Sequence, residues 1–156
     1  MTQANQAHPV SPEIVQLEEK RAAVLHVSGA ASELPTLLPE AFEATMRQIA
    51  DSGAQVAGPP FARYLSFGAR IDAEVGFPYL GSLVENDRVR GVTLPAGRAV
   101  LATHVGPYEE RGAAWARIQA WIREHGLTPT SAPWEAYLTG PDDPGQPVTQ
   151  IVFPVG

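Results

Sequence analysis

The sequence predicts an α+β fold built from two similar halves, each with the order strand, strand, helix, strand, strand. Three observations support this class. Several short runs alternate apolar and polar residues with a period of two, which is typical of strands. Two longer segments carry apolar residues at helical spacing, and the pattern of the first half recurs in the second. We therefore expect a duplicated fold with pseudo-two-fold symmetry, a mostly antiparallel sheet, and two main helices on one side of it.

The repeat is visible in the letters of the sequence, with a period of about 75 residues that is too long for a solenoid unit. Three pairs of segments match: RAAVLHVSG at 21–29 with RAVLATHVG at 98–106, PFARYL at 60–65 with PWEAYL at 133–138, and EVGFP at 74–78 with QIVFP at 150–154. After a flexible tail over residues 1–12, we expect a single domain over 13–156, with halves at about 13–80 and about 89–156. Two halves packed about such an axis leave a central cleft, a usual place for a ligand.

The first half contains one helix between two pairs of strands. Strands are predicted, in order, at 14–17, 21–27, 61–67 and 73–77. The helix is predicted over 34–49, where the apolar side chains share one face, and Gly53 suits the left-handed residue that follows a helix. We expect Pro78 to stop the last strand.

The second half repeats this order. Its strands are predicted at 92–94, 98–105, 134–139 and 148–155. The helix opens in the segment 106–110, where a proline and two glutamates suit a first turn. Its buried stripe is expected to comprise Ala114, Trp115, Ile118, Trp121 and Ile122. Gly126 suits the end of the helix, with Leu127 folding back onto the last turn.

The composition restricts the function. The chain of 156 residues is 44% hydrophobic and 18% charged, which is ordinary for a soluble protein. A net charge of −6 disfavours nucleic acid and anionic membranes as partners and favours cationic or neutral ones. The absence of cysteine excludes disulfides, thiolate metal sites and a cysteine nucleophile. No stretch resembles a signal peptide or a membrane span, so the cytoplasm is the expected location.

The segment 131–141 is the centre of the functional prediction. In its strand, one face carries Trp134, Ala136 and Leu138, and the other carries Glu135, Tyr137 and Thr139. We expect the apolar face to pack against a helix, which leaves a carboxylate beside a phenol on a wet face or in the wall of a ligand site. The repeat favours a site, because Tyr137 is matched by Tyr64 whereas Glu135 is matched by Ala62. A carboxylate that only one half carries is not required by the shared fold.

These features together resemble a known family. The residues that carry the resemblance are His104-Val105-Gly106-Pro107-Tyr108-Glu109, Ala114-Trp115, Trp121-Ile122, Pro133-Trp134-Glu135-Ala136-Tyr137-Leu138 with Pro141, and Phe153-Pro154-Val155. The chain resembles the GyrI-like, or bacterial effector-binding, domain, which forms the small-molecule-sensing part of MerR- and AraC-type multidrug regulators and also occurs alone. The match is specific in the second half and loose in the first.

The resemblance implies a duplicated βαββ fold around a central cleft that takes bulky, often cationic or polycyclic compounds. It implies that the glutamate at position 135 is the polar anchor of that cleft, and it places Tyr108 at its edge. Some relatives hydrolyse reactive cyclopropane-bearing toxins, and one inhibits DNA gyrase. Unlike the regulators, this sequence has no room for a helix-turn-helix at either end, so we expect no direct binding to operator DNA.

The other candidate residues have plainer interpretations. Packing between strands is an equally good account of Tyr64 and Tyr137, and a contact with its own helix is an alternative for Tyr108. The three tryptophans are expected in the core. The four histidines show no ligand spacing, and no phosphate-binding loop or nucleophile elbow is present, so we expect neither a metal nor a cofactor.

Three functions remain open at this point. The first is a small-molecule-binding protein for hydrophobic, cationic compounds, with Glu135 as anchor and Tyr64, Tyr108 and Tyr137 as walls. The second is a hydrolase in the same cleft, with Glu135 acting on water and Tyr137 as a proton donor. The third is a module that binds a protein partner such as gyrase, for which the acidic charge is weak support.

Overall fold

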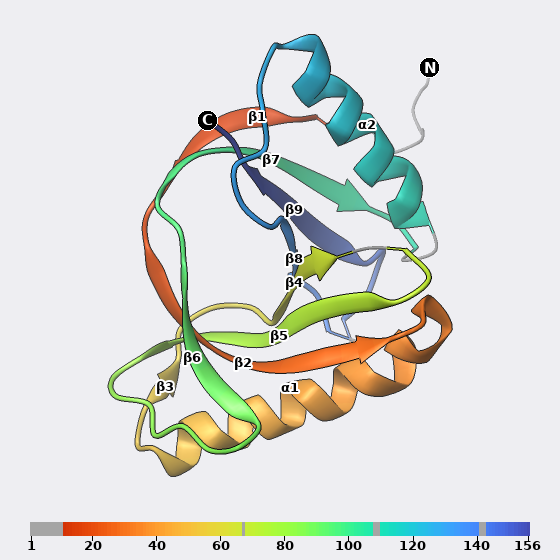
Figure 1. The fold of residues 1–156 in the computed structure, drawn as a ribbon. Coiled ribbons are helices and arrows are strands. Elements are labelled where there is room, and N and C mark those ends of the chain that lie inside the picture. Colours follow the sequence, from red (N-terminus) through yellow and green to blue (C-terminus); the bar gives the residue numbers. More distant parts are fainter. Residues whose placement is uncertain (1–10, 67, 108–109, 141–142) are drawn as a thin grey trace. The chain divides into compact units, whose positions relative to one another are not determined.

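The structure is a computed structural model that describes residues 11–66, 68–107, 110–140 and 143–156 (Figure 1). It divides into two compact units. Unit 1 contains residues 11–17 together with Gly97–Gly156, and unit 2 contains Glu18–Ala96. Each unit is an antiparallel sheet with one α-helix, which confirms the predicted α+β class.

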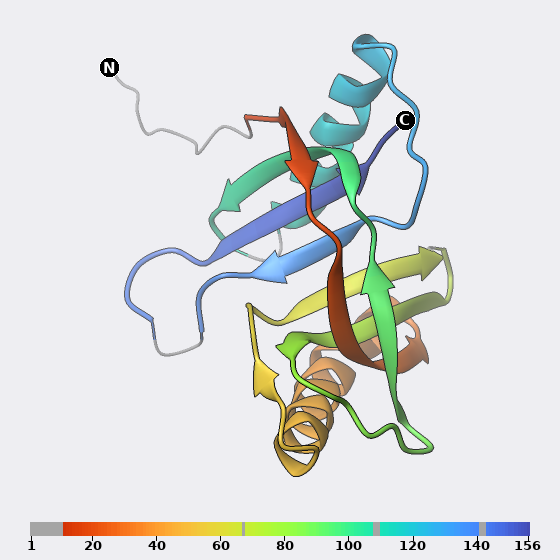
Figure 2. The ribbon, with the colours of Figure 1, turned by 90° about the vertical axis from the view of Figure 1, so that its left-hand side faces the viewer.

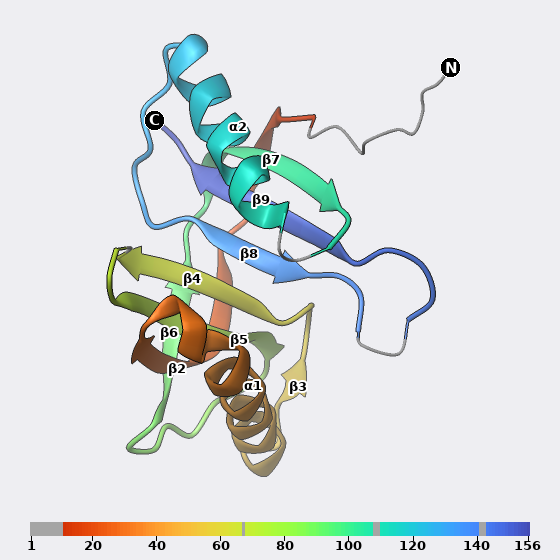
Figure 3. The ribbon, with the colours of Figure 1, turned by 90° about the vertical axis from the view of Figure 1, so that its right-hand side faces the viewer.

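Unit 2 contains a sheet whose strands pair in the order β6, β2, β5, β4. Its elements are β2 (Lys20–Gly29), the 3₁₀ turn η2 (Ala31–Glu33), α1 (Leu34–Asp51), β3 (Gln55–Val56), β4 (Phe61–Ser66), β5 (Ile71–Leu80) and β6 (Val89–Leu94). Helix α1 packs on β2 and β5 (Figure 3). The short strand β3, which the sequence pattern did not predict, pairs with the end of β5.

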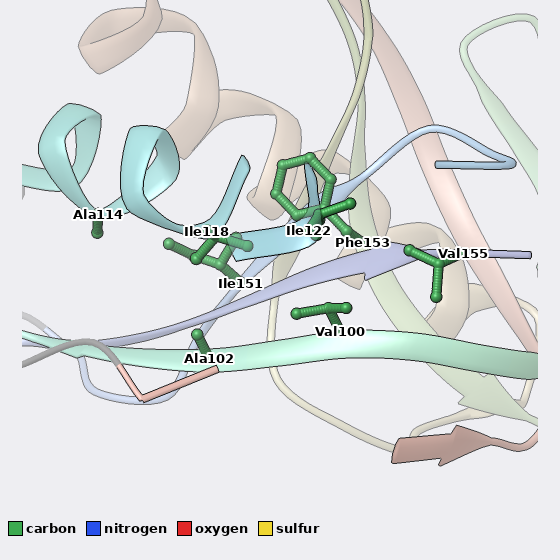
Figure 4. Packing of buried hydrophobic residues seen from close by; sticks show 8 residues of the cluster. All are labelled: Val100, Ala102, Ala114, Ile118, Ile122, Ile151, Phe153 and Val155. Atoms are coloured by element: carbon green, nitrogen blue, oxygen red, sulfur yellow. The ribbon is translucent and has the colours of Figure 1, made fainter. Parts of the chain in front are cut away.

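Unit 1 contains a sheet whose strands pair in the order β1, β7, β9, β8. Its elements are β1 (Glu13–Leu17), β7 (Gly97–Val105), α2 (Arg111–Glu124), β8 (Trp134–Tyr137) and β9 (Val148–Pro154). Helix α2 lies over β7 and β9 (Figure 3). The helix buries three of the five residues of the predicted stripe, Ala114, Ile118 and Ile122, against those strands (Figure 4). Trp115 and Trp121 are partly buried and pack against the same cluster.

The first strand of each half of the sequence pairs with a strand of the other half: β1 pairs with β7, and β6 pairs with β2. Strand β1 precedes β2 by only two residues, yet it pairs with β7 in unit 1 (Figure 2). Likewise β6 precedes β7 by two residues and pairs with β2 in unit 2. The chain therefore leaves unit 1 after Leu17 and returns to it at Gly97, an exchange that the repeat in the sequence did not reveal.

The registers of the two sheets confirm the internal repeat. Ala62 lies opposite Val75 in unit 2, and their repeat partners Glu135 and Ile151 lie opposite each other in unit 1. Ala23 lies opposite Phe77 in unit 2, and the matched residues of unit 1, Val100 and Phe153, also lie opposite each other. The matching letters therefore mark equivalent positions in three dimensions.

The helix ends follow the predictions. Gly53 and Gly126 both have positive φ, at 76° and 68°, a conformation that glycine adopts without a steric penalty. The amide of Leu127 donates to the carbonyl of Ile122, and the Leu127 side chain packs against the core of unit 1. No helix in the described part of the chain is long and apolar enough to cross a membrane.

The prediction that Pro78 ends its strand was wrong. Strand β5 continues to Leu80 and is ten residues long. The reason is the position of Pro78 in the sheet: the ladder with β4 reaches Gly76, and the ladder with β3 begins at Tyr79. Pro78, which has no N–H to donate, therefore lies between the ladder with β4 and the ladder with β3 and interrupts neither of them.

Candidate functional site

Glu135 is a buried carboxylate that accepts hydrogen bonds from at least three side chains of the described residues. Only 2% of the residue is exposed. Its Oε2 accepts hydrogen bonds from Arg111 Nη1 at 2.6 Å and from Tyr137 Oη at 2.8 Å, and its Oε1 accepts one from Trp115 Nε1 at 2.6 Å. A carboxylate taken out of water is costly unless donors replace its hydration, and these three supply that replacement.

Two of the donors come from the first two turns of α2. Arg111 and Trp115 are four residues apart, so their side chains lie on the same side of the helix. The arginine forms an ion pair with Glu135, and 28% of its side chain is exposed compared with 3% for the glutamate. The Trp115 ring also packs edge-on against Phe153, with ring centroids 5.0 Å apart. Trp115 is thus a core residue, as expected, whose indole N–H also binds the carboxylate.

The predicted orientation of β8 was wrong. We expected Trp134 and Ala136 to face a helix, but Glu135 and Tyr137 face α2. The register explains the orientation: Glu135 lies opposite Ile151, and Ile151 packs in the core with α2. Alternation along a strand identifies two faces, but it does not say which one the helix covers.

The four candidate residues have different outcomes. Tyr137 lies beside Glu135 and donates a hydrogen bond to it. Tyr64 belongs to unit 2, where it is buried in β4 opposite Ala73. Tyr108 lies outside the described residues. The roles of these tyrosines in binding remain predictions.

Polar side chains replace apolar ones at three equivalent positions. On the helix-facing side of unit 1, Glu135, Thr149 and His104 stand where unit 2 has Ala62, Ala73 and Val27; all six are buried. The register places Thr149 between Tyr137 on β8 and His104 on β7. Burial of polar groups is unfavourable unless they are hydrogen-bonded. Because unit 2 has apolar residues at the same three positions, this polar row is specific to unit 1 and is not required by the fold.

The polar row is only partly hydrogen-bonded. His104 Nε2 lies 3.1 Å from the carbonyl oxygen of Pro107. Since a carbonyl oxygen can only accept, the ring nitrogen is the donor of this hydrogen bond. The hydroxyl of Thr149, in contrast, is fully buried and has no hydrogen-bond partner among the described residues. A buried hydroxyl in this state is available to a water molecule or to a polar group of a ligand.

Sequence reasoning missed Arg111 and Trp115 as partners of Glu135. The signal that was present is their spacing of four residues at the start of a helix that covers the strand of Glu135. No group of three or more histidine, aspartate or glutamate residues that could hold a metal is found in the described ranges.

Known proteins share the fold of this chain. The family described as the GyrI-like small molecule binding domain matches residues 11–156. The C-terminal domain of EcmrR is 20% identical with a TM-score of 0.76, and the match covers 94% of this chain and 98% of that one. EcmrR in a complex with DNA is 21% identical with a TM-score of 0.81; the match covers 94% of this chain but 57% of that one.

Two further solved structures have the same fold. SAV2435 bound to tetraphenylphosphonium is 10% identical with a TM-score of 0.66, and the match covers 94% of each chain. A hydrolase from Listeria innocua is 16% identical with a TM-score of 0.60, and the match covers 93% of this chain and 91% of that one. At these identities the likeness shows the fold alone. No curated protein matches this chain.

Proposed function

Because this chain belongs to the family of GyrI-like small-molecule-binding domains, we propose that it binds bulky hydrophobic cations through the carboxylate of Glu135. The observation that carries the proposal is the burial of Glu135 at a position where the equivalent residue of unit 2 is Ala62. Alanine satisfies the packing of this position. A charged residue there contributes something other than packing, and binding an opposite charge is the simplest contribution.

The surroundings of Glu135 suit an organic cation. The ring of Trp115 and the phenol of Tyr137 both contact the carboxylate, so an aromatic surface adjoins the negative charge. Aromatic faces attract cations, and more strongly where water is excluded. Lipophilic cations also gain from burying their apolar surface, at about 25 cal/mol per Å². The ligand named for SAV2435, tetraphenylphosphonium, belongs to this chemical class, which supports its use as a probe.

The test compares a cation with a neutral molecule of similar shape. We expect Glu135→Gln to weaken binding of tetraphenylphosphonium by about tenfold to a hundredfold, because a charge-assisted contact contributes about 1.5–3 kcal/mol. Binding of triphenylphosphine oxide, which is neutral, should change much less. Isothermal titration calorimetry measures both affinities. Equal losses for the two compounds would contradict an electrostatic anchor.

A matched control is available in unit 2. Glu74 forms an ion pair with Arg63 at 3.3 Å, and both side chains are mostly buried. Glu74→Gln therefore removes a paired carboxylate at a different place and should leave the affinity for tetraphenylphosphonium unchanged. If Glu74→Gln weakens binding as much as Glu135→Gln does, the effect is a general loss of stability or charge.

A hydrolase is the second candidate, and one contact favours it. The phenol of Tyr137 lies 2.8 Å from Glu135 Oε2, a pairing that suits a proton donor beside a carboxylate. The hydrolase from Listeria innocua has the same fold. The reactive compounds suggested by the resemblance, with strained cyclopropane rings, are the class of substrate to test.

Turnover separates the two candidates. Tyr137→Phe should abolish ring opening of a cyclopropane-bearing electrophile, as followed by mass spectrometry, while tetraphenylphosphonium still binds. A protein that binds without hydrolysing will show no enzyme-dependent product with either the wild type or the variant. Full turnover by Tyr137→Phe would exclude that residue as the proton donor.

A further inference from the structure

The carboxylate of Glu135 is already paired with a cation of the protein. Arg111 Nη1 lies 2.6 Å from Glu135 Oε2, so the buried carboxylate has a guanidinium as its counter-ion. The pair has no net charge. A ligand cation that approached this pair would meet one negative and one positive group, and the attraction expected from Glu135 alone would be largely cancelled.

The position of Arg111 is unfavourable for its own helix. It is the first residue of α2, where the aligned peptide dipoles repel positive charge. Among the described residues the first turn itself carries no acidic side chain, and the neighbouring acid is Glu110, the N-cap of α2. The ion pair with Glu135 on β8 is a favourable interaction of this guanidinium, whereas its place at the helix terminus is not.

We infer that Arg111 is an internal competitor for Glu135, so that a cationic ligand binds by displacing the guanidinium from the carboxylate. The inference rests on the proposed function and adds the residue that sets charge selectivity. Arginine has a long, flexible stem, and 28% of the Arg111 side chain is exposed to solvent. The guanidinium can thus return to water while a ligand takes its place, and Glu135 is never left without a positive partner.

Competition selects for a particular class of cation. A small, strongly hydrated cation loses its own water on binding and offers little apolar surface in return. A bulky aromatic cation is weakly hydrated and gains from contact with the ring of Trp115. Only the second class compensates for the lost contact between Arg111 and Glu135. Arg111 therefore makes binding depend on the apolar surface of the cation.

The experiment removes the competitor and keeps the anchor. In the full chain, Arg111→Gln should tighten binding of tetraphenylphosphonium by about tenfold to a hundredfold and leave triphenylphosphine oxide nearly unchanged. Tetramethylammonium, a small cation, should bind the variant more tightly than the wild type. Arg117→Gln is the matched control, because Arg117 is an exposed arginine on the same helix.

Two further variants keep the test informative if Arg111→Gln folds poorly with an uncompensated carboxylate. Arg111→Lys keeps the charge but is a point donor, so it should also tighten binding of tetraphenylphosphonium, by a smaller factor. In Arg111→Gln/Glu135→Gln, the gain from the first change should disappear. Unfolding temperatures with and without tetraphenylphosphonium provide a second readout for all variants.

The outcomes separate this inference from the proposed function. If Glu135→Gln weakens cation binding but Arg111→Gln and Arg111→Lys leave it unchanged or weaken it, the competition is overturned and the anchor stands. If Glu135→Gln has no effect on cation binding, the proposed function fails and the inference fails with it. A gain in the Arg111 variants that persists without Glu135 would also overturn the competition.

Discussion

The indole Nε1 of Trp115 donates a hydrogen bond to Glu135 Oε1 at 2.6 Å, while the same ring packs edge-on against Phe153. Trp115→Phe would preserve most of the ring contact and remove the donor. Because the acceptor is a buried charge, we expect the free energy of unfolding to fall by about 1–3 kcal/mol. Urea unfolding followed by circular dichroism measures it. Trp121→Phe, on the same helix, is the control and should lower the free energy of unfolding by less.

The hydroxyl of Thr149 is predicted to contribute nothing to stability. It is buried without a hydrogen-bond partner among the described residues, so Thr149→Val should change the free energy of unfolding by less than about 0.5 kcal/mol or raise it. Thr45 is equally buried, but its hydroxyl donates to the carbonyls of Ala41 and Phe42. Thr45→Val should therefore cost about 1 kcal/mol. A larger loss for Thr149→Val would mean that its hydroxyl binds a structural water.

Replacing each of two glycines by alanine should change the stability of the protein in opposite directions. A Cβ at Gly76 would lie 1.8 Å from the carbonyl oxygen of Ala23 on the neighbouring strand, so Gly76→Ala should cost at least about 2 kcal/mol. At Gly112 in α2 a Cβ would meet nothing within 4 Å, and alanine favours the helix by about 0.5 kcal/mol. Thermal unfolding of the two variants measures both. A stable Gly76→Ala protein would show that β2 and β5 can separate.

Asp72 should titrate at an unusually low pH. The hydrogen bond from Ser66, and then one from Ser28, hold the pKa of the Asp72 carboxyl below its usual value of 3.8, assisted by the nearby His26 and Arg70. Because the folded-state pKa is lower than the unfolded one, the resulting stabilisation is present above about pH 3.8 and is lost as the pH falls through the folded-state pKa. NMR titration of the side chain measures the value.

Ser66→Ala should move the pKa of Asp72 upward, toward its usual value, because it removes the largest cause of the shift. Ser52→Ala is the control, since the Ser52 hydroxyl donates to the carbonyl of Gln48 and not to a carboxylate. A pKa that does not move in Ser66→Ala would contradict this account of the Asp72 hydrogen bond.

Much of the fold could be predicted from local patterns. Helical spacing identified both helices, and Gly53 and Gly126 marked their ends because positive φ is a local requirement. The pairing of β1 with β7 could not be predicted in this way. Only two residues separate β1 from β2, yet the partner of β1 lies more than half the chain away, and no local pattern indicates so distant a pairing.

The site was predictable only in part. Comparing the halves singled out Glu135, and the register shows that it occupies the position equivalent to Ala62. The same comparison aligns Thr149 with Ala73, which could have indicated a longer polar row. Arg111 was beyond this method, because the direction of a long side chain depends on how α2 crosses β8 and not on any repeated letter.

The exchange of β1 and β6 has a consequence for synthesis on the ribosome. All strands of unit 2 have been made once residue 96 has emerged, so that unit can close early. Strand β1 is made before unit 2, whereas its partner β7, at Gly97–Val105, is made after it. A nascent protein therefore carries an unsatisfied strand edge while the whole of unit 2 is made, and that edge is the place where a chaperone, or a mispaired neighbour, would act first.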